Sequence, residues 1–300
     1  MSGLEGEPHF CDVRVDRLAD AQVTIVGLGL MGGSLAGALR EQCRRVVGVA
    51  RRTETIEAAL SGGLVDQATM DLEDGAVEAD IVVLATPVRV ILRQLATIGP
   101  LLPPGCLLMD LGSTKGDIVA AMADLPPHVQ PLGGHPMCGK EKSGIKVADP
   151  ALYRERTFIL SPLARTSTRA LALGQALVQA VGANPLFVEA QRQDYLVATV
   201  SHLPYLLACA LVSTADATTS ADPLVWEIVA GGYRDTSRVA GSDVTMMLDI
   251  LITNRDKVMA ATEVYLSQLE QLRELVASGD EDALRARLSA IRETRREMYP

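Results

Sequence analysis

Aromatic side chains are scarce in this 300-residue sequence, and this scarcity determines which core the chain can build. Aromatic residues make up 3% of the chain, with one Trp and three Phe, whereas hydrophobic residues together make up 48%. The core is therefore expected to consist of Leu, Val, Ala, Ile and Met, as in helix-rich α/β proteins. The composition is globular rather than disordered, and the length favours two domains over one.

Cysteine pairs of the CxxC type are absent as well. The five cysteines are odd in number and scattered along the chain (Cys11, Cys43, Cys106, Cys138 and Cys209). Neither a disulfide framework nor a zinc site is expected from this pattern, and no metal is predicted. The N-terminus, MSGLEGEPHF, is acidic and lacks the apolar segment of a signal peptide. Reduced thiols and this N-terminus favour a cytoplasmic protein.

Positive charge is in deficit, and no long apolar run is uninterrupted. The 28 Lys and Arg against 37 Asp and Glu give a net charge of −9, which repels nucleic acid and anionic lipid. The longest apolar run, Val23 to Leu39, contains five glycines and a serine. A membrane span is not expected there. We therefore predict no nucleic-acid partner and no membrane partner, although a local basic pocket for a small anion is compatible with this charge.

Apolar strand-like runs alternate with helical stretches over roughly the first 190 residues. Strands are predicted at 22–27, 45–50, 80–86, 106–113, 129–134, 156–161 and 185–190, and helices at 31–40, 54–60, 88–98, after Lys115 and at 167–181. Continuous Val/Ile/Leu strands that alternate with helices indicate a parallel sheet covered on both faces. Residues 1–20 show no clear period and are predicted to form a leader that packs on the surface.

Strand signals stop after Ala190. Helices are predicted at 195–217, 222–230, 243–275 and 280–298. The first is apolar nearly all round, so it should be buried in its own domain or in a subunit interface. The predicted domains are 1–189, an α/β domain, and 190–300, an all-α domain that dimerises.

A GxGxxG motif, Gly27-Leu28-Gly29-Leu30-Met31-Gly32, follows the first predicted strand and opens a helix. In this context Gly27 permits a tight turn, Gly29 lets the backbone approach a pyrophosphate, and Gly32 allows close helix–strand packing. The free N–H groups of the helix then bind phosphate. A Rossmann-type dinucleotide-binding domain is predicted, the alternative being a glycine-rich turn in an ordinary βαβ unit. Position 87, a proline after Thr86, is a further candidate for contact with the cofactor.

The end of the second predicted strand distinguishes the two nicotinamide cofactors. An NAD site expects Asp or Glu there, but this strand meets Arg51 and Arg52. Two guanidinium groups suit a 2′-phosphate. NADP is therefore favoured, with NAD possible and two solvated arginines as the alternative interpretation.

Two more motifs lie where parallel strands end. His135, in GGHPMCG, is placed to meet the nicotinamide and has an ordinary pKa suited to proton acceptance. Ser113, in DLGSTK, could hydrogen-bond the substrate or His135. A structural histidine, and a helix cap at Ser113 or Thr114, are the alternatives.

A third motif, GGYRDTSR, lies in the helical region. Arg238 could bind a substrate carboxylate, with Asp235 holding a neighbouring donor in place. The alternative is a turn between helices that carries an Arg–Asp bridge.

Together these motifs resemble the prephenate and arogenate dehydrogenase family of tyrosine biosynthesis. The matching stretches are VGLGLMGGSLAGAL, DLGSTKG, GGHPMCGKEKSG, SHLPYLLACAL and GGYRDTSRVAGSD. The resemblance implies a dinucleotide domain, a helical dimerisation domain and a homodimer. It implies that His135 accepts a hydrogen bond from the ring hydroxyl with help from Ser113, and that Arg238 binds the ring carboxylate. His202 is similarly placed near the site, with helix packing as the alternative.

The sequence departs from the family pattern at several positions. Tyr205 stands where some members have a second histidine, near the substrate's side chain. Gln193-Asp194 replaces a His-Asp pair, and the acidic NAD residue is missing. The Arg51 pair is closer to the branch that uses NADP and accepts arogenate.

The activity implied is NAD(P)-dependent oxidative decarboxylation of prephenate, arogenate or both. One alternative is a β-hydroxyacid dehydrogenase, which uses a catalytic lysine, and another is a non-catalytic NADP sensor. The sequence leaves the choice between prephenate and arogenate open, and also feedback inhibition by tyrosine.

Overall fold

The computed structural model describes residues 11–140 and 142–298, which form parts of two compact units, Met1–Arg255 and Asp256–Pro300. Residues 1–10 of the predicted leader lie outside the described residues. The rest of the leader is not confined to the surface, because Val13 and Leu18 are buried in the core. The predicted domain boundary at residue 189 stays a prediction.

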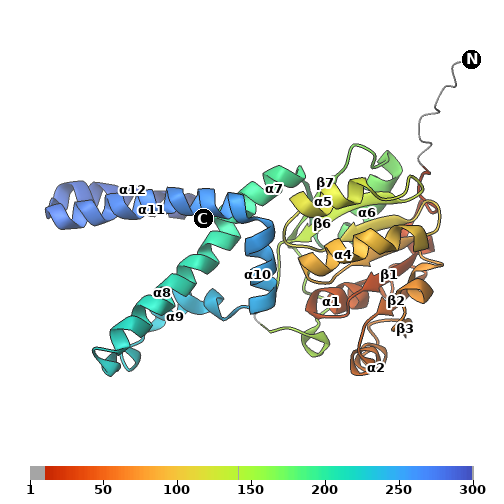
Figure 1. Ribbon diagram of the computed structural model, residues 1–300, viewed down its shortest axis with the longest axis horizontal. Coiled ribbons are helices and arrows are strands. Elements are labelled where there is room, and N and C mark those ends of the chain that lie inside the picture. The colour runs from red at the N-terminus through yellow and green to blue at the C-terminus, as the bar shows by residue number, and fades with distance from the viewer. Residues whose placement is uncertain (1–10, 141, 299–300) are drawn as a thin grey trace, which may run out of the picture. The chain divides into compact units, whose positions relative to one another are not determined.

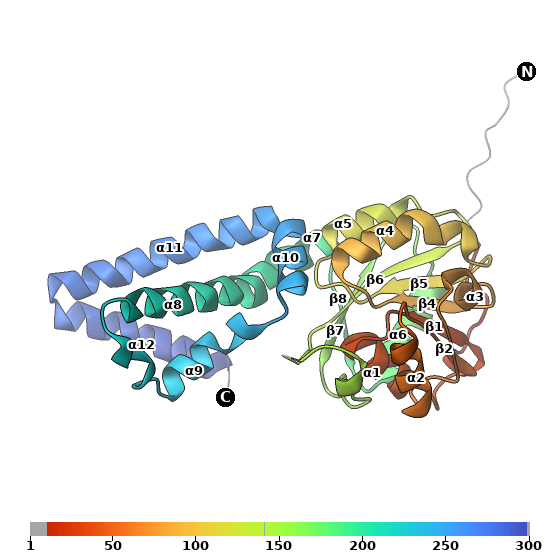
Figure 2. The ribbon, with the colours of Figure 1, turned by 60° about the horizontal axis from the view of Figure 1, so that its bottom comes forward.

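An eight-stranded sheet in the order β3-β2-β1-β4-β5-β6-β7-β8 forms the centre of the first unit (Figures 1 and 2). The strands are β1 (Gln22–Val26), β2 (Arg45–Val49), β3 (Gln67–Thr69), β4 (Ile81–Leu84), β5 (Leu107–Asp110), β6 (Gln130–Pro136), β7 (Thr157–Pro162) and β8 (Asn184–Phe187). Neighbouring strands are parallel except β6 and β7, which pair antiparallel. The predicted parallel sheet is therefore confirmed up to β6, and the reversal at β7 was not predicted.

Helices cover both faces of this sheet. They are α1 (Leu30–Leu39), α2 (Thr53–Ser61), α3 (Leu72–Ala76), α4 (Val88–Ile98), α5 (Gly116–Ala123) and α6 (Thr168–Ala180). Alternate side chains of one strand enter opposite cores: Val83 packs with the α1 and α6 side, and Val82 with the α4 and α5 side. Burying such a side chain is worth about 1.5–3 kcal/mol, so strands with apolar residues on both faces belong in this layer.

The chain beyond residue 189 is helical. It contains α7 (Ala190–Val197), a π-helical turn (Ala198–His202), α8 (Leu203–Thr219), α9 (Gly231–Ser237), α10 (Val244–Thr253), α11 (Arg255–Ser278) and α12 (Glu281–Met298). The predicted all-helical character is confirmed. The helix predicted at 222–230 was wrong, since this range contains only a 3₁₀ turn at Pro223–Trp226. The alternative of a turn between helices at GGYRDTSR is not observed either, because Gly231–Ser237 is helix α9.

The predicted helix 243–275 is also broken, at Asn254. The side chain of Asn254 is hydrogen-bonded to two groups outside α10 and α11, and its backbone leaves the helical region (φ −120°, ψ 26°). Helix α10 therefore ends just before Asn254 and α11 begins just after it, because tertiary contacts hold Asn254 outside the helical conformation.

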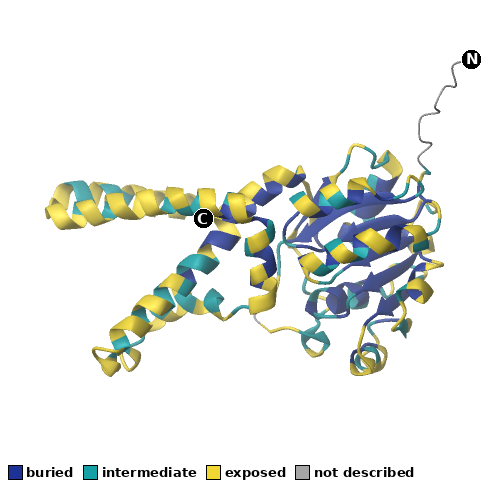
Figure 3. Cartoon of the chain, in the orientation of Figure 1, coloured by how far each residue is buried: buried dark blue, intermediate teal, exposed yellow. Residues whose placement is uncertain are grey.

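The apolar stretch that we expected to be buried is largely exposed within the single chain (Figure 3). Val200 is 68% exposed, whereas Leu203 and Ala208 are buried. By length and composition alone, Ala190–Thr219 is apolar enough to cross a membrane, a test that core helices of soluble proteins also pass. We predicted that this stretch is buried either within its own domain or in a subunit interface. Burial within its own domain is not observed.

Candidate active site

A cavity of about 620 Å³ lies at the carboxyl ends of β1, β4, β5 and β6, where ligands of open α/β sheets bind. Its other wall comes from the helical region after residue 189. Side chains and backbone that line it include Gly29, Leu30, Met31, Thr86, Pro87, Ser113, His135, Cys138, Lys140, Lys142, Ser201, Tyr205, Ser242, Asp243, Met246, Met247 and Ile250. The cavity therefore brings the predicted nucleotide turn, Ser113, His135 and Tyr205 together.

The glycine turn between β1 and α1 has a steric reason for each glycine. Gly27 has φ +103°, and a Cβ there would lie 2.9 Å from the carbonyl oxygen of Ala85. A Cβ on Gly32 would collide with the carbonyl oxygen of Gly27, whereas one on Gly29 would have nothing within 4 Å. The open side of Gly29 faces the cavity, and no side chain caps the N-terminus of α1. A pyrophosphate fits this cradle by shape and by the helix dipole.

Leu28, Arg51 and Arg52 are the other residues predicted to hold the nucleotide. Leu28 is buried beneath the turn, close to Gly48 of β2. Arg51 and Arg52 are exposed just after β2, and Arg52 occupies the position before α2. Neither arginine lines the cavity. Their place at the end of β2 is the one expected for contact with the 2′ position of a ribose.

His135 lies near the end of β6, 8% exposed and bordering the cavity. Burial is the main reason that the pKa of its imidazole is lowered to about 3, with smaller contributions from Lys115 and His202. The ring is therefore neutral at physiological pH. Its Nδ1 is buried without a hydrogen-bond partner among the described residues. A neutral imidazole beside a cavity can accept a proton.

Ser113 borders the cavity on the turn after β5. The alternative that Ser113 or Thr114 caps the next helix is wrong. Asp194 takes that role from α7, because its carboxylate accepts hydrogen bonds from the backbone N–H groups of Lys115 and Gly116, both at 2.7 Å. The hydroxyl of Thr114 is instead 2.8 Å from that of Thr253. The Ser113 side chain is thus left for the cavity.

His202 and Tyr205 come from the π-helical turn and the start of α8. Tyr205 borders the cavity, and His202 is 1% exposed behind it. Burial lowers the pKa of His202 to about 4. His202 Nδ1 lies 3.2 Å from Asn254 Nδ2, while its Nε2 has no partner among the described residues.

Arg238 and Asp235 are not brought into the cavity. Both are exposed, and the residues that border it nearby are Val239, Ser242 and Asp243. Sequence reasoning missed Lys140, Lys142 and Asp243. For the lysines a signal existed, because two cations close behind a histidine at a strand end could have indicated an anion site.

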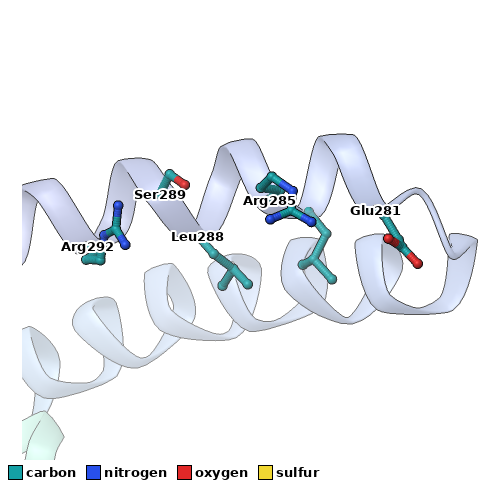
Figure 4. A pocket seen from close by; sticks show the side chains of 6 residues that line it. Glu281, Arg285, Leu288, Ser289 and Arg292 are labelled. Carbon is teal, nitrogen blue, oxygen red and sulfur yellow. The ribbon is translucent and has the colours of Figure 1, made fainter.

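A second, shallow pocket lies on one helix, α12 (Figure 4). All of its lining residues, from Glu281 to Arg292, belong to that helix. Within 11–140 and 142–298, no group of three His, Cys, Asp or Glu side chains is placed to hold a metal ion. The chemistry of the described chain therefore concentrates at the cavity around His135.

Comparison with known proteins agrees with this geometry. The family model "Prephenate dehydrogenase, nucleotide-binding domain" matches residues 35–186, and "Prephenate dehydrogenase, dimerization domain" matches residues 189–290. A prephenate dehydrogenase of Bacillus subtilis is 33% identical over 268 residues, which is 87% of this chain and 72% of that protein.

Solved structures give the same picture. Prephenate dehydrogenase from Aquifex aeolicus, in complex with hydroxyphenyl propionate and NAD+, is 31% identical with a TM-score of 0.85, covering 94% of this chain and 99% of that one. Synechocystis arogenate dehydrogenase is 29% identical with a TM-score of 0.81, covering 92% and 99%.

Proposed function

Because the chain belongs to the prephenate dehydrogenase family, we propose how its cavity performs the family's reaction and which residues take part. The chain is an NAD(P)-dependent enzyme of tyrosine biosynthesis. The reaction is oxidative decarboxylation, which converts prephenate to 4-hydroxyphenylpyruvate, arogenate to tyrosine, or both. The observation that carries the proposal is a buried, neutral His135 that shares a cavity with the glycine turn and Ser113.

The glycine turn, residues 27–32, would hold the pyrophosphate of a pyridine nucleotide at the N-terminus of α1. A nucleotide bound there would supply the acceptor for the hydride of the ring carbon that carries the substrate's hydroxyl. The protein itself contributes the orientation of nucleotide and substrate, because the open side of Gly29 and the residues Thr86 and Pro87 border the same cavity.

His135 accepts the hydroxyl proton while the C–O bond gains carbonyl character, and Ser113 holds the hydroxyl and the imidazole in line. The C–C bond to the ring carboxylate then breaks, its electron pair enters the ring, and CO₂ leaves. His135 returns the proton to the phenolic oxygen. No proton is lost overall, so a neutral imidazole is restored for the next turnover.

Substrate binding is proposed for Arg238, Asp235, His202 and Tyr205. Arg238 binds the ring carboxylate, and its chain neighbour Val239 already borders the cavity. Tyr205 contacts the substrate's side chain, where prephenate has a keto group and arogenate an ammonium group. Arg238→Ala is expected to raise KM more than it lowers kcat, because the ring carboxylate is still intact while the hydride is transferred, so the contact is made both in the ground state and in that transition state.

NADP is the cofactor we propose, with Arg51 and Arg52 binding the 2′-phosphate. Support comes from the exposed arginine pair at the end of β2 and from the absence of a carboxylate there. We also propose a cytoplasmic homodimer. Exposed apolar side chains such as Val200 and the match to a dimerisation domain support this assembly.

The test is the rate of reduced-nucleotide formation with prephenate and with arogenate, each with NADP+ and with NAD+. Turnover of either substrate is expected, and the ratio of kcat/KM values assigns substrate and cofactor. A protein that binds nucleotide but turns over neither substrate would overturn the proposal.

A further inference from the structure

A fully buried ion pair lies directly under the cavity. Asp110 is the last residue of β5, and its carboxylate contacts the ammonium group of Lys115, five residues further along the chain. Both side chains are completely shielded from solvent. Neither of them borders the cavity. The pair therefore cannot contact a substrate bound in the cavity. Any effect on the reaction must come through the backbone groups to which Asp110 is hydrogen-bonded.

The carboxylate of Asp110 divides its two oxygens between two backbone segments. Oδ2 accepts a hydrogen bond from the N–H of Gly112 at 2.7 Å, and Oδ1 accepts one from the N–H of Gly134 at 3.1 Å. Gly112 immediately precedes Ser113, and Gly134 immediately precedes His135. One side chain thus joins the turn after β5 to the end of β6, neighbouring strands in the sheet (Figure 2).

Both glycines are pressed against Asp110. A Cβ on Gly112 would lie 2.8 Å from Asp110 Oδ2, and a Cβ on Gly134 would lie 2.5 Å from the backbone oxygen of Asp110. A larger residue at Gly112 would push against the carboxylate itself, and one at Gly134 would push its own strand away from the backbone of Asp110. The two glycines are therefore a steric condition for the double hydrogen bond.

We propose that Asp110 is a positioning residue that sets Ser113 and His135 relative to each other, and that Lys115 holds the Asp110 carboxylate in place. This inference rests on the proposed function of Ser113 and His135. A purely stabilising role fits poorly, because apolar residues of similar volume often replace a buried ion pair with no loss of stability. Misplacing a catalytic group by about 1 Å can cost about a hundredfold in rate.

Lys115 also acts on His135 through its charge. The ammonium group contributes to the lowered pKa of His135, after the larger effect of burial. The other titratable or charged groups around His135 are His202 behind the cavity, Asp110 beneath it, and Cys138, Tyr205, Lys140, Lys142 and Asp243 on its lining. Since these stay in place in a Lys115 variant, removing the ammonium should let His135 protonate at a higher pH.

The experiment compares Asp110→Asn, Lys115→Met and the double variant with wild type and with Asp80→Asn. Asp80 is a matched control, because it is also buried, paired with arginines, and accepts a hydrogen bond from a strand N–H, that of Gln22. It precedes β4, at the opposite end of the strands from the cavity. The quantities measured are kcat, KM, the nucleotide Kd by calorimetry, and Tm.

Asp110→Asn is expected to lower kcat about a hundredfold while the nucleotide Kd stays within about twofold. Asp80→Asn should lower Tm but keep kcat within about twofold. The double variant should regain Tm relative to the single variants without regaining kcat, and it replaces Asp110→Asn should that variant fail to fold. Lys115→Met should move the acid limb of the kcat profile to higher pH.

Two results would overturn the inference: a kcat near that of wild type in both Asp110 variants, or a loss of nucleotide binding in proportion to the loss of kcat. His135→Asn is assayed in parallel to separate this inference from the proposed function. If His135→Asn is inactive while the Asp110 variants turn over normally, only the positioning role fails. If His135→Asn itself turns over normally, the proposed function fails.

Discussion

The side-chain amide of Asn254 determines which nitrogen of His202 carries the proton. Asn254 Nδ2 lies 3.2 Å from His202 Nδ1 and donates at 2.8 Å to the backbone oxygen of Asp194. An amide NH₂ group can only donate, so Nδ1 must accept, and the proton of the neutral ring is on Nε2. Because burial keeps the pKa of His202 near 4, this neutral tautomer is the form present at pH 7.

Asn254→Leu should therefore release the tautomer of His202. We expect a mixed population of the two His202 tautomers. We also expect KM for prephenate or arogenate to rise about tenfold, which is equivalent to about 1.4 kcal/mol of binding free energy. Long-range ¹H–¹⁵N NMR of labelled histidine measures the tautomer directly. Asn184→Leu, at an exposed position of β8, is the control. An unchanged tautomer in Asn254→Leu would contradict the assignment.

Replacing His135 should remove the proton acceptor while keeping its volume. His135→Asn is expected to lower kcat by about 10²–10⁴, since a positioned base contributes that range. Nucleotide Kd should stay unchanged, because the glycine turn is a separate element. The control is His128→Asn, where the ring contacts the backbone oxygen of Leu102 outside the cavity. Turnover close to wild type in His135→Asn would rule out the catalytic role.

The two arginines after β2 should discriminate between cofactors. Arg51→Ala combined with Arg52→Ala is expected to raise KM for NADP+ by about a hundredfold or more, since two charge-assisted contacts to phosphate are lost and each is worth about 1.5–3 kcal/mol. KM for NAD+ should change little. Arg93→Ala, at an exposed position on α4, provides the control. An equal loss for both nucleotides would mean that the arginines act on the structure of α2 instead.

The buried histidines should make stability depend on pH. Their pKa values are lowered to about 3 for His135 and about 4 for His202, whereas an unfolded histidine titrates near 6.5. Between these values the unfolded chain binds more protons, so the free energy of unfolding should fall as pH decreases below about 6.5. Above that pH the contribution is fully present.

Urea unfolding of wild type and His135→Asn between pH 4.5 and 7.5 measures this effect. Burial raises the pKa of Asp110 and of Asp194, which acts on the pH dependence of stability in the opposite direction. The difference between the two proteins isolates the histidine, and its slope should be positive with increasing pH. Parallel pH dependences in the two proteins would show that His135 does not titrate with a lowered pKa.

The sheet and the cavity followed from local patterns in the sequence. Strand β4 is a continuous apolar run, and GxGxxG needs only a strand before it and a helix after it to place a turn. His135 and Ser113 could be assigned to the same edge because parallel strands bring their carboxyl ends together. The antiparallel β7 could not be predicted, since direction depends on how the chain returns rather than on residue period.

Residues that act by positioning other residues could not be predicted from the sequence. Asp194 caps α5 from 78 positions away, and Asn254 reaches His202 across 52 positions. Asp110 was visible only as one letter of a motif, because its two acceptor contacts depend on the distance between β5 and β6. Arg238 is the opposite case. The GGYRDTSR motif made it a candidate for substrate binding, but it is not among the residues that line the cavity.

The π-helical turn at Ala198–His202 gives the helical wall a property that no single side chain has. An α-helix advances about 100° per residue, and a π turn accommodates one residue more than an α turn. The wider turn therefore absorbs one residue without turning the face of α8 that carries Tyr205 away from the cavity. A deletion within Ala198–His202 could close this turn as an α turn and keep that face in place, whereas a deletion within α8 before Tyr205 would rotate it by about 100°.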